Sequence, residues 1–240
     1  MVCLGWETLD CGGTGMRAGA RKLQGIYVIT DETLVPGRTH ADIVCAAVRG
    51  GTSIIQLRDK CAPDSHLMVV GKELRRVTSG SGVLFIVNDR VKVALACNAD
   101  GLHVGQGDMS ADQVRRLWLD GILGVSVATP EQAAAAEKAG ADYLGVGPVF
   151  ATSTKSDSRP PVGPEQVRLI RAASSLPIVA IGGINLDNIG EVALAGADAA
   201  AVISAVVCSD DMVAATQALV RAWGASCGPE PSNQYPEPDC

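Results

Sequence analysis

The sequence predicts a single (β/α)8 TIM barrel of the α/β class, and three observations lead to this fold. Eight strand-like apolar runs alternate with helix-like segments over about 200 residues, a typical barrel size. Hydrophobic residues make up 47% of the chain but aromatic residues only 3%, so aliphatic side chains must form the core, as parallel strands prefer. Polar residues follow the strand-like runs, where such barrels carry their active sites. A doubly wound open sheet also alternates this way, but eight repeats in a chain of this size favour the barrel.

The first half of the chain contains four strand–helix pairs separated by turn signals. We expect strands over residues 25–30, 53–57, 83–88 and 102–104, and helices over residues 39–48, 64–78, 91–97 and 110–121. Gly50 and Gly51 end the first helix, because glycine favours the position that follows a helix. Pro63 precedes the second helix, and Ser110 is a candidate N-cap for the fourth, which we expect to end at Gly121.

The second half repeats this alternation four more times. We expect strands over residues 123–127, 143–146, 178–181 and 199–203, and helices over residues 130–139, from 163 onward, 186–194 and 210–223. Thr129 is the expected N-cap of the first of these helices, with Pro130 in its first turn and Gly140 as its stop. Gly163 and Pro164 open the next helix after a long polar loop.

An Ala-Asp pair precedes the expected fourth, sixth and eighth strands. These pairs are Ala99-Asp100, Ala141-Asp142 and Ala197-Asp198. We interpret them as one repeated helix-to-strand turn with a structural role, because the N-terminal face of such a barrel usually serves stability.

One catalytic barrel over residues 24–223 is expected between two extensions, 1–23 and 224–240, that match no barrel element. The first extension is rich in glycine, and we expect it to be flexible. The second contains Gly, Pro, Ser and acidic residues, and we expect it to be disordered. The net charge of −6 argues against nonspecific binding of nucleic acid. A membrane span is not expected either, because the sequence has no uninterrupted apolar run of about 18 residues. The sequence leaves the oligomeric state open.

Eight cysteines are scattered through the chain without a CxxC pair or a Cys/His cluster of zinc spacing. Cys45, Cys97 and Cys208 lie in apolar runs, and we expect them to be small core residues. Cys61 is expected to be an ordinary loop thiol. Cysteines without a disulfide framework, together with the lack of a secretory signal in the first twenty-odd residues, predict a cytoplasmic protein.

Two acids, Asp89 and Asp108, follow neighbouring strands of the expected barrel. The C-terminal ends of adjacent strands share one face, so both carboxylates can reach the same point there. Magnesium prefers hard oxygen ligands and is often held by one or two carboxylates together with substrate phosphates. We therefore predict a Mg2+ site, against the alternative that Asp89 is a helix cap and Asp108 an ordinary loop acid.

Cations and amides cluster after the second and third strands. Gln56, Arg58 and Lys60 alternate along an extended segment and therefore share a face, which suits a diphosphate and a polar ring. Asn88 adds an amide, and Asp59 is a candidate for holding Arg58 in place. The alternative is a surface ion-pair cluster. His103, inside a strand without a second histidine or cysteine nearby, suggests a core or supporting role rather than metal binding.

The later strands are followed by residues suited to a second phosphate. Gly182 and Gly183 come after the seventh strand and Ile203-Ser204 after the eighth, the usual phosphate position in such barrels. The loop over residues 151–161 is long enough to act as a lid. It places Thr152, Thr154 and Lys155 where they can bridge two substrates, and a merely solvated loop is the alternative.

Eight motifs, in this order along the chain, resemble the thiamine phosphate synthase family. They are YVITD (27–31), QLRDK (56–60), VNDRV (87–91), ADGLHVGQGD (99–108), GVSV (124–127), YLGVGPVFATSTK (143–155), PIVAIGGI (177–184) and AVISA (201–205). A single motif such as IGGI occurs in other barrels, but the combination is highly specific.

The resemblance implies an enzyme that joins two small-molecule substrates, a pyrimidinylmethyl diphosphate and a thiazole phosphate, through a dissociative step that releases pyrophosphate. It implies that Asp89 and Asp108 hold Mg2+. The residues it assigns to the pyrimidine diphosphate are Gln56, Arg58, Lys60, Asn88, Ser126 and Lys155. Of these, Arg58, Lys60, Ser126 and Lys155 would stabilise the leaving group. Those it assigns to the thiazole phosphate are Thr152, Thr154, Gly183, Ile203 and Ser204.

Three other functions remain as alternatives. A thiazole tautomerase is a related barrel that, in the family as known, uses a histidine near the fifth strand, where this chain has Ser126. A non-catalytic thiazole- or thiamine-binding barrel would not need the paired acids Asp89 and Asp108. A phosphate isomerase would need a central base in the mouth of the barrel, and the sequence offers none there.

Overall fold

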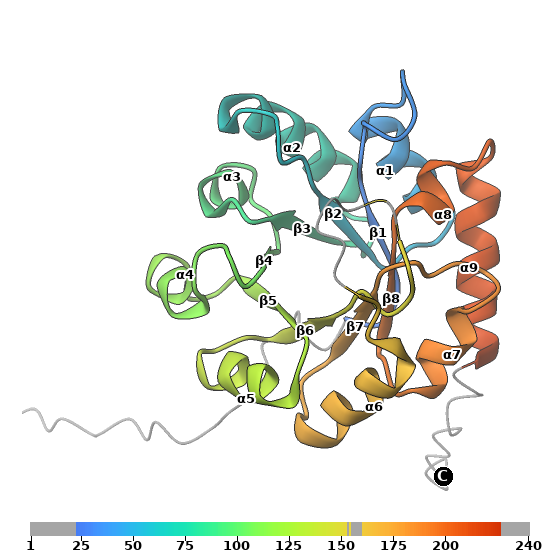
Figure 1. Ribbon diagram of the computed structural model, residues 1–240. Helices are drawn as coiled ribbons and strands as arrows, with labels where there is room; N and C mark the ends of the chain where they lie inside the picture. Colours follow the sequence, from blue (N-terminus) through green and yellow to red (C-terminus); the bar gives the residue numbers. More distant parts are fainter. Residues whose placement is uncertain (1–22, 153, 155–159, 227–240) are drawn as a thin grey trace, which may run out of the picture.

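The computed structural model describes residues 23–152, 154 and 160–226, and in it eight parallel strands close into a barrel surrounded by helices (Figure 1). The strands are β1 (Gly25–Ile29), β2 (Ile54–Leu57), β3 (Leu84–Asn88), β4 (Gly101–Val104), β5 (Ile122–Val127), β6 (Tyr143–Val146), β7 (Ile178–Ile181) and β8 (Ala199–Val202). Each strand pairs with its neighbours in sequence, and β8 pairs in parallel with β1. The predicted TIM barrel is confirmed, because an open sheet has no such closing pair.

The helices lie outside the barrel and cover its strands, as Figure 1 shows in a view along the barrel. They are α1 (His40–Arg49), α2 (Asp64–Thr78), α3 (Val91–Ala96), α4 (Ala111–Leu117), α5 (Pro130–Lys138), α6 (Gly163–Ala173), α7 (Ile189–Leu194), α8 (Ser204–Val207) and α9 (Met212–Ser226). The predicted N-caps are confirmed at two helices. Ser110 accepts a hydrogen bond from the Gln113 N–H, and Thr129 accepts one from the Gln132 N–H.

The predicted bounds of two helices were wrong because side chains end or delay them. Helix α4 ends at Leu117, because Trp118 adopts an extended conformation. Gly121 therefore does not end the helix, and glycine is needed there for close packing. A Cβ there would lie 2.3 Å from the Trp118 ring. Helix α7 begins at Ile189 rather than at residue 186, because the Asn188 side chain accepts from the Asn185 N–H in a preceding turn, 2.9 Å away.

The C-terminal part of the barrel also differs from the prediction. Short helix α8 was missed, and the last helix runs from Met212 to Ser226 instead of ending at residue 223. Helix α9 packs against α1, α7 and α8 (Figure 1). Residues 1–22 and 227–240, which hold most of the two predicted extensions, lie outside the described residues.

The cysteine prediction was right at one position and wrong at two. Cys97 is buried, but Cys45 and Cys208 are exposed free thiols, as is Cys61. The apolar run around Cys45 belongs to helix α1, whose buried residues include Ile43, Val44, Ala46 and Ala47, so the helical period turns Cys45 outward. Averaged hydrophobicity does not resolve this difference between neighbouring helical positions.

The interpretation of the Ala-Asp pairs as a repeated structural turn is confirmed. Each aspartate directly precedes one strand and accepts a backbone N–H from the strand before it in sequence. It also pairs with an arginine from the helix that leads into this earlier strand. The three sets are Arg75–Asp100–Phe85, Arg115–Asp142–Leu123 and Arg171–Asp198–Ile178. These clamps lie at the N-terminal ends of β3, β5 and β7, so they fasten the face of the barrel opposite the strand ends that carry the predicted site.

Within residues 23–152, 154 and 160–226, no helix combines the length and the apolar character that a bilayer crossing needs.

Candidate active site

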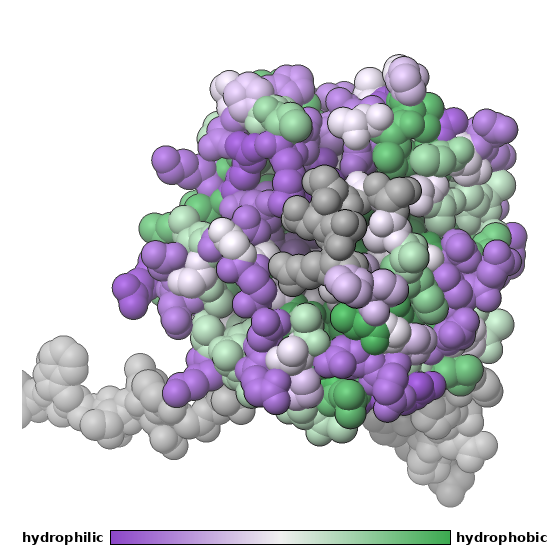
Figure 2. Space-filling view, viewed as in Figure 1, coloured by the Kyte–Doolittle hydropathy of each residue, from purple (hydrophilic) through white to green (hydrophobic). Residues whose placement is uncertain are grey.

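A cavity of about 280 Å³ opens at the C-terminal ends of the strands. In Figure 2, hydrophilic side chains gather around this mouth on the side of α2 and α3, and more apolar ones on the side of α8. Nearly all predicted site residues line the cavity, namely Gln56, Arg58, Lys60, Asn88, Asp89, Asp108, Ser126, Thr152, Thr154, Gly183, Ile203 and Ser204. Lys155 lies outside the described residues. The structure therefore brings together side chains that come from seven of the eight strand ends.

Asp89 and Asp108 form a coupled pair of carboxylates at the mouth of the cavity. Burial, and then the neighbouring Asp108, raise the pKa of Asp89 to about 6. Burial opposes ionisation of Asp108 as well, but hydrogen bonds from Asp89 and from the Gly105 N–H outweigh it and lower its pKa. The Lys60 ammonium lies 3.6 Å from Asp89 and partly offsets the negative charge. Two carboxylates that share one proton are placed where a cation would substitute for that proton.

The donor set fits magnesium better than a transition metal. Among the described residues, no group of three or more His, Cys, Asp or Glu side chains is arranged to hold a metal by itself. Magnesium usually takes one or two carboxylates and completes its shell with water and substrate phosphates. Asp89 also adopts a left-handed backbone conformation, with φ of 60°, which is uncommon for a residue other than glycine and is typical of functional sites.

Arg58 is held by a partner that the sequence did not suggest. Its guanidinium lies 3.3 Å from Asp31 Oδ2, and both side chains are largely buried. The suggestion that Asp59 holds Arg58 was wrong. Asp59 instead accepts the backbone N–H groups of Cys61 and Ala62, at 2.7 and 2.9 Å, and so shapes the turn that follows β2.

The glycine pair after β7 has a packing reason as well as a position that suits phosphate. Gly182 and Gly183 have φ values of 102° and 65°, which favour glycine. A Cβ on Gly183 would lie 2.4 Å from the Ala151 carbonyl oxygen, and one on Gly182 would lie 2.5 Å from Pro148 Cβ. The pair therefore lets the β6–α6 loop lie directly against the β7–α7 loop at the rim of the cavity.

Comparison with known proteins decides which family carries this site. The family model described as thiamine monophosphate synthase matches residues 26–206. The chain belongs to this family. A thiamine-phosphate synthase from Methanospirillum hungatei is 52% identical over 194 residues, covering 80% of this chain and 94% of that protein. One from Methanoregula boonei is 53% identical over 196 residues, covering 81% and 90% respectively.

A solved structure agrees with these sequence relatives. A thiamine phosphate pyrophosphorylase from Pyrococcus furiosus superposes with a TM-score of 0.80 at 43% identity, covering 86% of this chain and 98% of that one. The protein is thus a transferase of thiamine biosynthesis, as the motifs predicted.

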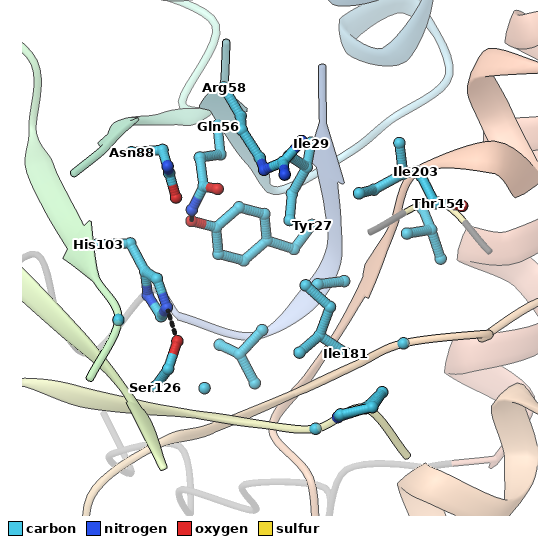
Figure 3. A pocket seen from close by; sticks show the side chains of 18 of the residues that line it. Tyr27, Ile29, Gln56, Arg58, Asn88, His103, Ser126, Thr154, Ile181 and Ile203 are labelled. Atoms are coloured by element: carbon cyan, nitrogen blue, oxygen red, sulfur yellow. Dashed lines mark hydrogen bonds between the residues drawn. The ribbon is translucent and has the colours of Figure 1, made fainter. Parts of the chain in front are cut away.

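Tyr27 and Tyr143 of this synthase site were not assigned roles from the sequence, whereas His103 supports a site residue as expected. His103 Nε2 lies 2.9 Å from Ser126 Oγ, as the dashed line in Figure 3 marks, and Gln56 Nε2 donates to the Tyr27 hydroxyl at 2.7 Å. Tyr143 and Tyr27 also line the cavity. A signal was available, because two of the three tyrosines in a chain with 3% aromatic residues lie inside strands.

His40 supports the site from behind Arg58. Its Nδ1 lies 2.7 Å from Thr30 Oγ1, which in turn accepts the Arg58 backbone N–H at 3.2 Å. Among the described residues, its buried Nε2 has no hydrogen-bond partner, and it lies 3.8 Å from Glu32 and 3.9 Å from Asp59. Burial lowers the pKa of His40, although the nearby carboxylates, Glu32 first, oppose this shift.

The lowered pKa of His40 predicts that acid weakens the fold. Below the ordinary histidine pKa of 6.5, the unfolded chain takes up a proton at this residue while the folded protein does not, so the free energy of unfolding falls as the pH falls. His40→Gln should remove this contribution. Urea unfolding of the wild-type protein and of His40→Gln at several pH values between 8 and 5 measures this contribution. Asp89 titrates in both proteins, so the difference between their free energies of unfolding isolates the effect of His40. Parallel stability curves would contradict the prediction.

Proposed function

We propose that the enzyme couples 4-amino-2-methyl-5-pyrimidinylmethyl diphosphate with 4-methyl-5-(2-phosphoethyl)thiazole and releases thiamine phosphate and pyrophosphate, with Mg2+ as its cofactor. One observation carries the proposal. The paired carboxylates Asp89 and Asp108 lie beside Lys60 at the mouth of a single cavity, and amide and hydroxyl groups line the same cavity. Paired acids suit a cation that binds a diphosphate, and the amides suit a polar ring.

The pyrimidine diphosphate is assigned to the β2, β3 and β5 side of the cavity. The Gln56 and Asn88 amides face the ring, and Arg58, Lys60 and Ser126 contact the diphosphate. Lys155 is assigned to the diphosphate through the family resemblance alone. Asp31 keeps the Arg58 guanidinium in place at 3.3 Å, which favours a preorganised contact over one that must form on binding.

Magnesium, when bound by Asp89 and Asp108, would neutralise charge that grows on the departing diphosphate. Lys60, 3.6 Å from Asp89, is close enough to share that task, since a cation at Asp89 would leave its ammonium directed to the diphosphate. Arg58, Lys60 and Ser126 would orient the leaving group.

The thiazole phosphate is assigned to the opposite rim. Gly183 follows β7, and Ile203 and Ser204 follow β8 at the start of α8, where backbone N–H groups suit phosphate in barrels of this kind. Thr152 and Thr154 extend over the same rim from the β6–α6 loop. The two substrates are thereby assigned to facing sides of one cavity.

The bond changes balance without a general base. The methylene carbon–oxygen bond breaks, and its electron pair leaves with the diphosphate. The pyrimidine ring stabilises the resulting cation, and the lone pair of the thiazole nitrogen forms the new carbon–nitrogen bond. That nitrogen carries no proton, so the enzyme needs to stabilise charge rather than to remove a proton.

The test is an assay of the purified full chain with Mg2+ and both substrates, in which thiamine phosphate is oxidised to its fluorescent form and measured. Product that disappears with EDTA and returns with added Mg2+ is expected. A folded protein that gives no product would overturn the proposed substrates, and thiazole isomer conversion would then be assayed. Product that EDTA does not reduce would overturn the magnesium assignment alone.

Ser126→Ala tests the division of the cavity between the two substrates. The variant should lower kcat by at least about tenfold, because it removes one donor to the leaving group, and should change the KM for thiazole phosphate little. Steady-state kinetics with each substrate varied in turn measures both. A raised KM for thiazole phosphate with an unchanged kcat would move Ser126 to the other substrate.

We also propose that the reaction takes place in the cytoplasm. The cysteines among the described residues, Cys45, Cys61, Cys97 and Cys208, are all free thiols, which is compatible with a reducing compartment.

A further inference from the structure

A chain of hydrogen bonds crosses the barrel interior beneath the cavity. Gln56 Nε2 donates to the Tyr27 hydroxyl at 2.7 Å, and the Tyr27 and Tyr143 hydroxyls lie 3.2 Å apart. The Tyr143 hydroxyl lies 3.0 Å from His103 Nδ1, and His103 Nε2 lies 2.9 Å from Ser126 Oγ. We call these five residues the buried chain. It joins strands on opposite sides of the barrel, and Figure 3 shows both of its ends facing the cavity.

The barrel interior is shaped to admit the buried chain. Gly124 stands beside Tyr143, and a Cβ there would lie 2.0 Å from the Tyr143 ring carbon Cζ. Gly145 stands beside His103, and a Cβ there would lie 2.7 Å from His103 Cε1. Each glycine therefore makes room for one ring, so the hydrogen bonds are built into the barrel rather than left by chance packing.

The two phenols make the buried chain directional. Burial raises the pKa values of Tyr27 and Tyr143 above their usual value, so each hydroxyl keeps its single proton and donates only once. Because Gln56 donates to Tyr27, the Tyr27 proton is available to Tyr143, and the Tyr143 proton is then available to His103 Nδ1. A neutral imidazole that accepts at Nδ1 carries its proton on Nε2 and donates it to Ser126.

The end of the buried chain is the side chain assigned to the leaving group. Because Ser126 Oγ accepts from His103, the Ser126 proton is directed to another acceptor, and the hydroxyl lies at the cavity wall. We propose that the buried chain fixes His103 with its proton on Nε2 and thereby makes Ser126 a hydrogen-bond donor toward the substrate, with Tyr27, Tyr143 and His103 as positioning residues. The assigned tautomer rests on the contacts of the buried chain. Only its effect on turnover rests on the proposed function.

The direct test is nitrogen NMR of the full chain labelled with ¹⁵N in histidine, at pH 8, where a histidine of ordinary pKa is neutral. A His103→Gln variant assigns the His103 signals among three histidines. The wild-type protein should show a proton on Nε2 and none on Nδ1. Tyr143→Phe removes the donor to Nδ1, and this preference should be lost. A proton on Nδ1 in the wild-type protein, or an unchanged tautomer in Tyr143→Phe, would overturn the proposal.

Tyr27→Phe tests whether orientation is transmitted along the buried chain. Tyr27 lies next to Gln56 and Tyr143, so this variant leaves the hydrogen bonds of His103 to Tyr143 and Ser126 in place. The His103 signals should nevertheless move in the direction seen in Tyr143→Phe. Unchanged signals would show that Tyr27 does not affect the His103 tautomer and that only the contact between Tyr143 and His103 sets it. Thr216→Val is the matched control, because it removes a buried hydroxyl on α9 that bonds Met212, far from the buried chain. It should leave the His103 signals unchanged.

Kinetics adds a second readout that a purely structural role would not move. Tyr143→Phe should lower kcat about tenfold and leave the KM for thiazole phosphate within about twofold, as expected for a residue that orients another. An altered His103 tautomer with an unchanged kcat would overturn the link to Ser126. If the assay substrates gave no product with wild-type enzyme, the proposed function would fail while the NMR result would still decide the direction of the buried chain.

Discussion

Asp89→Asn is expected to lower turnover by at least about tenfold while it makes the metal-free protein more stable at pH 8. The loss of turnover follows from removing one of the two carboxylates proposed to hold Mg2+. Asparagine is the better replacement than alanine, because it tolerates the left-handed backbone, with φ of 60°, at this position. Turnover is measured at saturating Mg2+, and near-normal activity there would remove Asp89 from the metal site.

The gain in stability follows from the raised pKa of Asp89. A carboxyl group whose pKa is about 6 in the folded protein, against 3.8 ordinarily, holds its proton more tightly when folded. Its contribution to stability is full below pH 3.8 and is lost as the pH rises through about 6. At pH 8 the ionised Asp89 is therefore unfavourable, first because it is buried and then because it repels Asp108, and asparagine removes both penalties.

Urea unfolding in EDTA compares the wild-type protein with Asp89→Asn at pH 8 and at pH 4. The variant should be more stable at pH 8, and the advantage should shrink at pH 4, where Asp89 of the wild-type protein is largely protonated. A variant that is less stable at pH 8 would show that the ionised Asp89 does not destabilise the fold. The opposite effects on activity and on metal-free stability would identify Asp89 as a residue kept for function.

Arg115→Ala is expected to destabilise the fold by about 3–5 kcal/mol, the usual cost of breaking a buried ion pair. The side chains of Arg115 and Asp142 are only 11% and 8% exposed. Arg115 also donates to the carbonyl oxygens of Gly121 and Gly140, at 2.6 and 2.8 Å. Its removal takes the Arg115 guanidinium away from the buried Asp142 carboxylate, so the loss is a large share of a typical folding free energy.

A graded set of controls makes this prediction sharp. Arg75→Ala should lower the free energy of unfolding by less than Arg115→Ala, because the ion pair between Arg75 and Asp100 is more exposed. Arg168→Ala removes an exposed pair with Glu165, with side chains 51% and 70% exposed, and should change the free energy of unfolding by less than about 1 kcal/mol. Urea unfolding ranks the three variants. Equal losses of unfolding free energy in Arg115→Ala and Arg168→Ala would show that the buried Arg115–Asp142 pair stabilises the fold no more than an exposed pair does.

The barrel and much of its site were predictable because they depend on local patterns. Strand-like runs such as residues 143–146 and 178–181 have bounds set by neighbouring residues, and the structure reproduces both. Asp89 and Asp108 were placed together because the C-terminal ends of neighbouring parallel strands share one face. A prediction failed where a side-chain contact rather than the residue pattern decided, as at Gly121, which lies against the ring of nearby Trp118.

The sequence by itself determined the order of strands and helices, the face that carries the polar residues, and the family. The tertiary structure alone decided which side chains meet across the barrel. Asp31 replaced Asp59 as the partner of Arg58 because β1 and β2 are neighbours whose following loops touch. Tyr27 and Tyr143 lie 116 positions apart and meet only because the barrel closes. Hydrophobic periodicity is a short-range property of the chain, whereas the direction of a buried hydrogen bond depends on partners that closure brings together.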